Sequence, residues 1–189
     1  MAEPAARIKA TYEDLYTIPE NMTGEIIDGE MSVTPRPSAR HIYSGTRFGS
    51  VLVAGYDFGS GGPGGWIILD EPEISFGEDI LVPDLAGWKK ERFSVSEEHN
   101  WISVVPDWVC EIISPGTVRK DRIQKMPIYG RHDVPYVWLI DPIAKSLEIF
   151  RLESGRWTVA GLYAENDKVR AEPFEQMEIN LADLWLENA

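Results

Sequence analysis

Two carboxylates of this chain stand inside runs of apolar residues. Glu111 is the only charged residue in the run 108–113, and Asp84 interrupts the run 80–88 in the same way. An unpaired charge inside an apolar layer costs several kcal/mol, unless a metal ion, a cationic partner or neutralisation relieves it. These two acids are therefore the first candidates for a site that does chemistry.

The chemistry that two such acids could do depends on how close they come. Carboxylates on the same face of adjacent strands can approach within about 5 Å, where they repel each other and call for a divalent cation or a lysine. Mg²⁺ fits, because it takes one or two carboxylates, keeps several waters and brings in substrate phosphates. Lys125 is the candidate lysine, since Asp121, Lys125 and Tyr129 share one face of the predicted helix that follows Glu111.

The run 108–113 predicts the strand that positions Glu111. Successive strand side chains point to opposite faces, and here both faces are otherwise apolar. One face holds Val109, Glu111 and Ile113, and the other holds Trp108, Cys110 and Ile112. This pattern is typical of a central strand covered on both sides. Residues 81–88 predict the strand that carries Asp84.

The other elements follow from turn and capping signals. We expect a short helix after Thr11, a hairpin about Asp28-Gly29, a helix from Ser38 to about Tyr56, and a helix from Thr117 to about Gly130 whose last turn Pro127 should kink. Further strands are expected near residues 66–69, 73–76 and 136–140, with an antiparallel pair at 147–152 and 157–163. Together they predict one α/β (α+β) domain over residues 1–189, with a mixed sheet.

Composition limits the class of protein. The 189 residues are 43% hydrophobic, as in a packed domain, and the single Cys110 excludes an intrachain disulfide and a CxxC zinc site. No run approaches the roughly 20 apolar residues of a membrane span, and residues 1–14 hold no stretch typical of a signal peptide. We therefore expect a cytoplasmic protein without membrane contact.

The charge distribution bears on nucleic-acid binding. A net charge of −13 weighs against a broad nucleic-acid footprint, because phosphates are bound mostly by Lys and Arg. Two segments, 31–56 and 119–132, are nevertheless locally basic. They are compatible with a nucleic-acid partner and do not require one.

The motifs in this order resemble the Uma2 restriction endonuclease family, a branch of the PD-(D/E)XK nuclease superfamily. The resemblance covers roughly residues 12–185. It rests on Pro83-Asp84, Glu111-Ile112-Ile113-Ser114-Pro115, Asp121…Lys125…Tyr129 and the run 136–142, with Glu25 and His41 at matching places.

This resemblance implies a restriction-endonuclease-like mixed central sheet flanked by helices, with an N-terminal hairpin and C-terminal antiparallel strands. It also implies Mg²⁺- or Mn²⁺-dependent hydrolysis of the phosphodiester bonds of a nucleic acid, with DNA expected as the substrate rather than RNA. Asp84, Glu111 and the backbone carbonyl of Ile112 would be the metal ligands. Since Ile113 stands where the superfamily has its lysine, Lys125 would take that catalytic role, and Glu25 is a further candidate.

Alternatives remain open. An inactive relative that serves as a protein-interaction or assembly module is favoured by the net charge and by Ile113. A glycosidase-like hydrolase with two carboxylates is disfavoured, because Lys125 suits phosphate better than sugar. At the level of residues, Asp84 and Glu111 could be structural carboxylates, Lys125 a surface partner of Asp121, and His41 a helix-start residue. A homodimer is left open, as for many nucleases that cut both strands.

Overall fold

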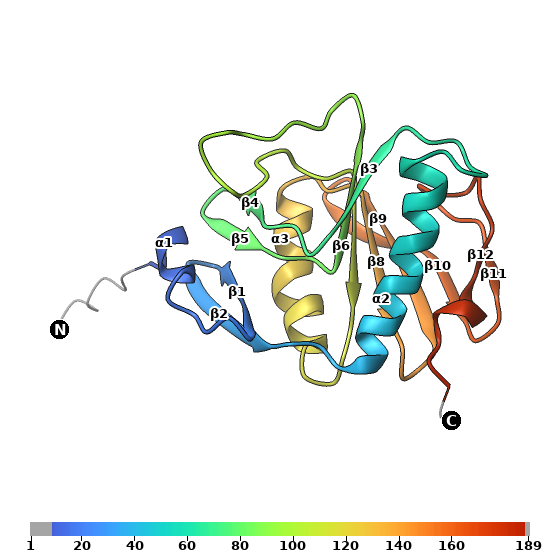
Figure 1. Cartoon of the computed structure of the whole chain (residues 1–189), viewed down its shortest axis with the longest axis horizontal. Helices are drawn as coiled ribbons and strands as arrows, with labels where there is room; N and C mark the ends of the chain where they lie inside the picture. Colours follow the sequence, from blue (N-terminus) through green and yellow to red (C-terminus); the bar gives the residue numbers. More distant parts are fainter. Residues whose placement is uncertain (1–8, 188–189) are drawn as a thin grey trace.

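The computed structural model describes residues 9–187, so residues 1–8 and 188–189 of the predicted domain lie outside it (Figure 1). The helical elements are α1 (Tyr12–Leu15), α2 (Ala39–Leu52), α3 (Met126–Arg131), two π-helical segments (Val53–Asp57 and Lys120–Lys125) and a 3₁₀ turn (Leu181–Leu184). The strands are β1 (Met22–Ile27), β2 (Glu30–Pro35), β3 (Trp66–Asp70), β4 (Ile74–Phe76), β5 (Asp79–Leu81), β6 (Leu85–Lys89), β7 (Trp108–Ile112), β8 (Tyr136–Asp141), β9 (Ser146–Glu153), β10 (Arg156–Ala164), β11 (Lys168–Val169) and β12 (Ile179–Asn180).

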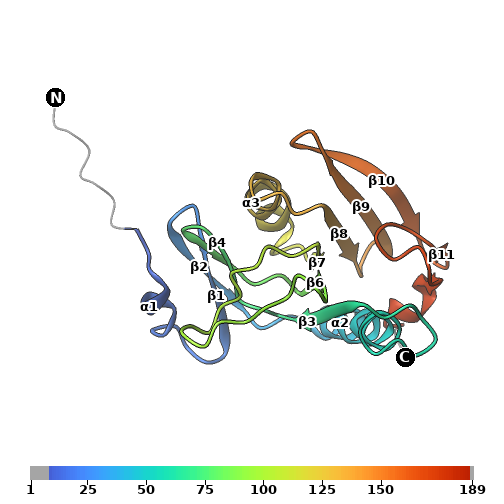
Figure 2. The same cartoon turned by 90° about the horizontal axis from the view of Figure 1, so that it is seen from above.

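The larger sheet is mixed, as predicted. Its order is β10-β9-β8-β7-β6-β3, and its pairs are antiparallel except β7 with β8. It lies between α2 and α3 (Figure 2). Trp108, Cys110 and Ile112 belong to the core cluster with α2, whereas Val109 belongs to the cluster with α3. The prediction that both faces of this strand are covered is confirmed.

The smaller sheet, in the order β2-β1-β5-β4, contains the predicted N-terminal hairpin. Asp28 and Gly29 have φ values of 51° and 75°, and turns with positive φ at both central residues match the twist of a hairpin. Ile27, Phe76 and Leu81 of this sheet pack in the same cluster as the buried residues of α3. Helix α3 thus lies between the two sheets, and the predicted fold class is confirmed, including the antiparallel strands β9–β12 near the C-terminus.

The prediction of one strand over residues 81–88 is wrong. This stretch contains the end of β5, which belongs to the smaller sheet, and most of β6, which belongs to the larger. Pro83 stands between them, and proline cannot donate a ladder hydrogen bond. Asp84 therefore lies where the chain crosses between the sheets, directly before β6, and not inside a strand.

The helix that follows Glu111 is irregular before Pro127. Helical structure begins after Thr117 and takes the π form over residues 120–125, where the N–H of Met126 donates to the carbonyl of Asp121, five residues earlier. A proline ring crowds the carbonyl four residues before it and offers no N–H in return. The kink was predicted in the last turn of the helix, whereas Met126–Arg131 forms the α-helix α3 and the irregularity is a widened π turn just upstream of Pro127.

The predicted helix from Ser38 is confirmed. The Ser38 hydroxyl accepts a hydrogen bond from the His41 N–H, which caps the N-terminus of α2, and π-helical turns continue the helix to Asp57. Within the part of the chain that the structure describes, no helix is long and apolar enough to cross a membrane.

Candidate active site

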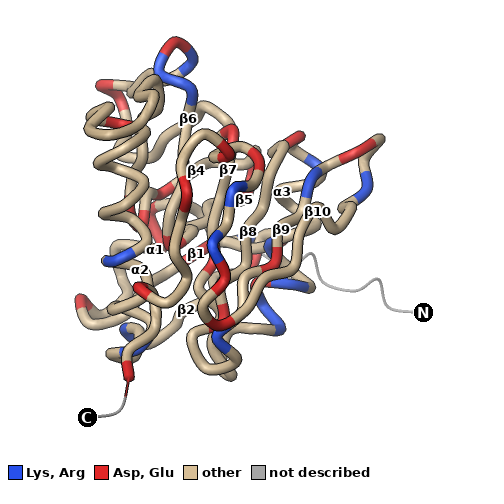
Figure 3. The backbone as a smooth tube through the Cα atoms, turned by 90° about the vertical axis from the view of Figure 1, so that its right-hand side faces the viewer, with Lys and Arg blue, Asp and Glu red and all other residues tan. Residues whose placement is uncertain are grey.

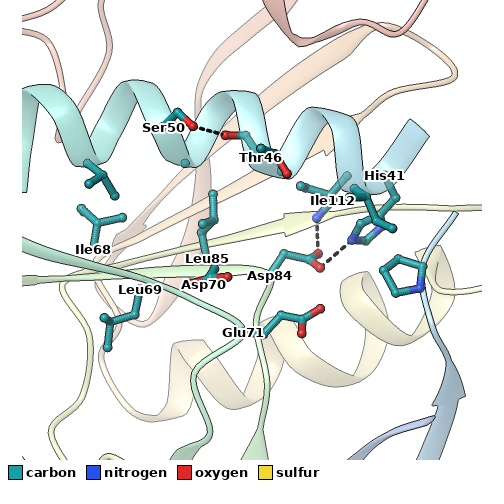
Figure 4. A pocket seen from close by; sticks show the side chains of 15 residues that line it. His41, Thr46, Ser50, Ile68, Leu69, Asp70, Glu71, Asp84, Leu85 and Ile112 are labelled. Atoms are coloured by element: carbon teal, nitrogen blue, oxygen red, sulfur yellow. Dashed lines mark hydrogen bonds and ion pairs between the residues drawn. The ribbon is translucent and has the colours of Figure 1, made fainter. Parts of the chain in front are cut away.

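Asp84 is held between the start of α2 and the end of β7. Strands β6 and β7 pair from Leu85 and Cys110 onward, and the Asp84 carboxylate continues this ladder by accepting a hydrogen bond from the Ile112 N–H at 2.6 Å. Its other oxygen, Oδ1, lies 2.6 Å from His41 Nε2 (Figure 4). Two donors from separate elements therefore fix the orientation of this carboxylate.

Glu111 lies on the face of β7 that it shares with Val109, toward α3. Its Oε1 lies 2.7 Å from Lys125 Nζ and accepts a hydrogen bond from the Tyr129 hydroxyl at 2.5 Å. The side chains of Lys125 and Glu111 are 2% and 3% exposed. Lys125 is therefore a buried partner of Glu111 and not a surface partner of Asp121.

Glu25 reaches the same lysine from β1 of the smaller sheet. Its Oε1 lies 2.9 Å from Lys125 Nζ and accepts a hydrogen bond from the Val82 N–H at 2.9 Å. The Lys125 ammonium also donates to the Val82 carbonyl at 3.1 Å. An ammonium group has three donors, so Glu111, Glu25 and Val82 together satisfy Lys125.

The structure adds Lys120, which is not among the residues predicted for the site. Lys120 Nζ lies 2.6 Å from Glu25 Oε2, and its side chain is 13% exposed. Residues five apart diverge on an α-helix, but the i→i+5 turn between Lys120 and Lys125 brings them onto one side. Pro127 was the available signal, since it is what disturbs this turn.

All five residues predicted for the site meet at one cavity. A cavity of about 300 Å³ is lined by Glu25, Asp84, Glu111, Ile112 and Lys125, together with Lys120, Asp121, His41 and Arg36. Its lining holds five acids, Glu25, Glu71, Asp84, Glu111 and Asp121, and three basic residues, Arg36, Lys120 and Lys125. When all of these groups are ionised and His41 is neutral, the acids exceed the basic residues by two, and such a balance favours a bound cation.

Burial raises the pKa of Glu111 to about 8, and the charges of Asp121, Asp84 and Glu25 add to this effect while Lys125 opposes it. Burial alone would also raise the pKa of Glu25. There, the two lysines outweigh burial, and the pKa is lowered. The pKa values of the two glutamates that share Lys125 are thus shifted in opposite directions by their surroundings.

The pKa values of the basic partners are also set by burial acting against neighbouring charges. Burial would lower the pKa of Lys125, but Glu111 and Glu25 outweigh it and hold the pKa well above its ordinary value. Burial would also lower the pKa of His41, and its hydrogen bond to Asp84 together with the charge of Asp84 raises it instead. Both groups are therefore stabilised in their charged forms.

The donors present fit a Mg²⁺ ion with few protein ligands. Residues 9–187 hold no group of three or more His, Cys, Asp or Glu side chains placed around a common metal position. Two carboxylates and one backbone carbonyl, completed by water, nevertheless match the usual coordination of Mg²⁺. The contacts of Glu111 with Lys125 and Tyr129 both fall on Oε1, so they leave Oε2 to a ligand in the cavity that Glu111 lines.

The two locally basic segments supply all the lysine and arginine side chains among residues 9–187 that line this cavity. Acidic positions are distributed over helices, strands and loops, with Lys and Arg between them (Figure 3). Of the two locally basic segments, the first brings Arg36 to the cavity and the second brings Lys120 and Lys125. Positive charge is thus brought to the candidate site within an otherwise acidic molecule.

Comparisons with known proteins agree with this architecture. The family model Uma2, described as "Putative restriction endonuclease", matches residues 10–182. A solved structure described as a "putative nuclease belonging to DUF820" from Anabaena variabilis ATCC 29413 superposes with a TM-score of 0.75 at 21% identity, over 93% of this chain and 97% of the other. At this identity the likeness shows the fold. A search of curated proteins found no match.

Proposed function

The chain belongs to the Uma2 family, which is described as "Putative restriction endonuclease". We propose that it is a Mg²⁺- or Mn²⁺-dependent endonuclease that hydrolyses the phosphodiester bonds of nucleic acid, with DNA rather than RNA as the expected substrate. The observation that carries the proposal is the meeting of Asp84, Glu111, Ile112 and Lys125 at one cavity. The acids come from apolar surroundings, and the lysine reaches Glu111 from a separate helical segment.

Asp84, Glu111 and the carbonyl of Ile112 would hold the ion. Bound there, Mg²⁺ would polarise a phosphoryl oxygen and lower the pKa of a water. The Ile112 N–H and His41 keep Asp84 in a fixed orientation, as outer partners commonly do for metal ligands. Tyr129 does the same for Glu111.

The lysines would supply positive charge for the phosphate. Lys125 would stabilise developing charge and orient the attacking water while it holds Glu111. Glu25 bridges both lysines and sets their positions. Lys120, the more exposed of the two, would contact the phosphate that enters the cavity.

The test is incubation of the pure protein with plasmid DNA and with RNA, in EDTA, Mg²⁺ or Mn²⁺. We expect cleavage that needs the metal, is lost in Glu111→Gln and is retained in Glu153→Gln, a matched change at an exposed glutamate. If the wild type cuts neither substrate with either metal, the proposal fails.

The alternative is an inactive module for protein interaction or assembly. One observation favours it: the three donors of Lys125 are already satisfied by acceptors of the chain itself, as in a purely structural network. This alternative predicts neither cleavage nor a metal-dependent melting temperature. A cytoplasmic location and a homodimer stay predictions.

A further inference from the structure

A second cavity, of about 450 Å³, lies between α2 and the strands β3 and β6. His41, Asp84 and Ile112 line this cavity (Figure 4) and also line the cavity that holds the lysines. The two cavities therefore meet at the carboxylate that is proposed to hold the metal. Whatever group is attached to a phosphate in the first cavity lies next to the second.

The two cavities differ in charge. Lys120, Lys125 and Arg36 line the first cavity, whereas no lysine or arginine among residues 9–187 lines the second. The second combines apolar side chains with hydroxyl and carboxylate groups: Val53, Ile68, Leu85, Thr46, Ser50, Asp70 and Glu71. Such a lining repels phosphate but suits a flat neutral ring whose amino groups donate hydrogen bonds.

The second cavity is preformed by the close approach of α2 to the sheet. A Cβ at Gly45 would lie 3.0 Å from Ile112 Cδ1, and a Cβ at Gly49 would lie 3.2 Å from Leu85 Cδ2. These glycines let the helix backbone lie directly on the side chains of β7 and β6. The exposed Thr46 and Ser50 stand beside them at the cavity, on the same helix.

We propose that the second cavity binds the nucleobase of the nucleotide adjacent to the bond that is cut. This inference rests on the proposed function, since it takes the phosphate to the first cavity. A base inside a duplex is stacked and paired and cannot enter a pocket, so enzymes that take up a base act on single strands or turn it out of the helix. The substrate class is therefore nucleic acid with an unpaired base at the cleavage position.

The test that does not depend on cleavage is photocrosslinking. An oligonucleotide that carries 5-iodocytosine, a photoreactive base with an amino group, at successive positions is bound to the protein with Ca²⁺ in place of Mg²⁺, irradiated, and mapped by mass spectrometry. We expect crosslinks to the segment 46–53 of α2 and its extension. Thr46→Trp, which fills the cavity from an exposed position, should reduce them at least tenfold, whereas Thr46→Ser and the exposed control Ala39→Trp should retain them.

Single-stranded and fully paired probes distinguish the two sources of the base. Crosslinks with the single strand alone indicate a single-strand nuclease, and crosslinks with both indicate a base turned out of the duplex. Crosslinks that map elsewhere, that persist in Thr46→Trp or that do not form overturn the base site. Failure of the proposed function is seen separately, as absence of cleavage by the wild type with Mg²⁺ and Mn²⁺, whatever the crosslinks show.

Discussion

Glu111 and Glu25 come from different sheets and share the ammonium group of Lys125, which lies 2.7 Å from one carboxylate and 2.9 Å from the other. All three side chains are almost fully buried. Removing one member of such a network leaves buried charge without compensation. This geometry allows predictions that separate stability from catalysis.

Lys125→Met should lower the free energy of unfolding by about 3–5 kcal/mol, because the buried oxygens of Glu25, Glu111 and Val82 lose the ammonium group that they share. Urea unfolding at neutral pH measures the change. Lys145→Met, which removes an exposed pair with Glu187, should cost at most about 1 kcal/mol. Where Lys125→Met is still folded, we expect plasmid nicking to fall by roughly two orders of magnitude or more. Nicking at the wild-type rate would contradict the catalytic role.

Metal binding should raise the melting temperature of the wild type, since a ligand bound only by the native state stabilises it. Asp84→Asn should abolish the shift produced by millimolar Mg²⁺ or Mn²⁺. Without metal, Asp84→Asn should cost about 1–3 kcal/mol, because an amide has one acceptor oxygen for the two donors from Ile112 and His41. If repulsion between Asp84 and Glu111 were the only effect, Asp84→Asn would leave the free energy of unfolding unchanged or raise it. Equal metal shifts in both proteins would place the cation elsewhere.

The pH dependence of stability in EDTA should reflect Glu111. Its pKa of about 8 lies above the ordinary 4.5, so between these values the native state binds a proton that the unfolded chain has lost. The free energy of unfolding should therefore fall as pH rises from about 5 to 8, by up to roughly 1.4 kcal/mol per pH unit. The groups that face Glu111 are Lys125, Tyr129, Asp121, Asp84 and Glu25.

The control for this pH effect is Glu111→Gln, which should flatten the decline. His41 contributes in the same direction, because its raised pKa gives stability that is lost as pH rises through that pKa. His41→Gln should therefore flatten the curve less than Glu111→Gln does. Urea unfolding at pH 5.5, 7 and 8.5 tests both variants, and an unchanged slope in Glu111→Gln would refute the assignment.

Lys120→Met should raise KM for the nucleic acid and reduce its salt dependence, since Lys120 is the cavity lysine with the greater exposure. The neighbouring Arg119 is exposed and does not line the cavity. Arg119→Met is thus a matched change of charge, and its effect should be smaller. Kinetics at two salt concentrations decide between the variants. Equal effects of both would mean that Lys120 acts only through long-range charge.

The residues that could be predicted from the sequence are those that differ in type from their neighbours within one strand, helix or turn. Glu111 was visible because every neighbour in its strand is apolar, and Asp28-Gly29 fixed a hairpin because both residues tolerate positive φ. Lys125 followed from helical spacing to Tyr129. These signals are local in sequence, so the chain alone carries them.

What could not be predicted depended on packing between elements. Both halves of residues 79–89 form strands, and only their partners show that Asp84 lies at a crossing between sheets. The approach of Lys120 to Glu25 needs the π turn, which spacing on an α-helix does not indicate. The contact of His41 with Asp84 joins residues that the sequence separates by 43 positions.

The order of the charged residues along the chain determines when the candidate site can form during synthesis. Glu25 and Asp84 leave the ribosome before Glu111, and the lysines that compensate Glu25 come last. A nascent chain that ends before residue 120 would have to bury Glu25 without a cation, which is strongly unfavourable. We therefore expect the smaller sheet to become stable only after the segment with Lys120 and Lys125 has been synthesised. The candidate site then forms only when most of the domain has been made. An incomplete chain would carry the acids of the candidate site without its lysines.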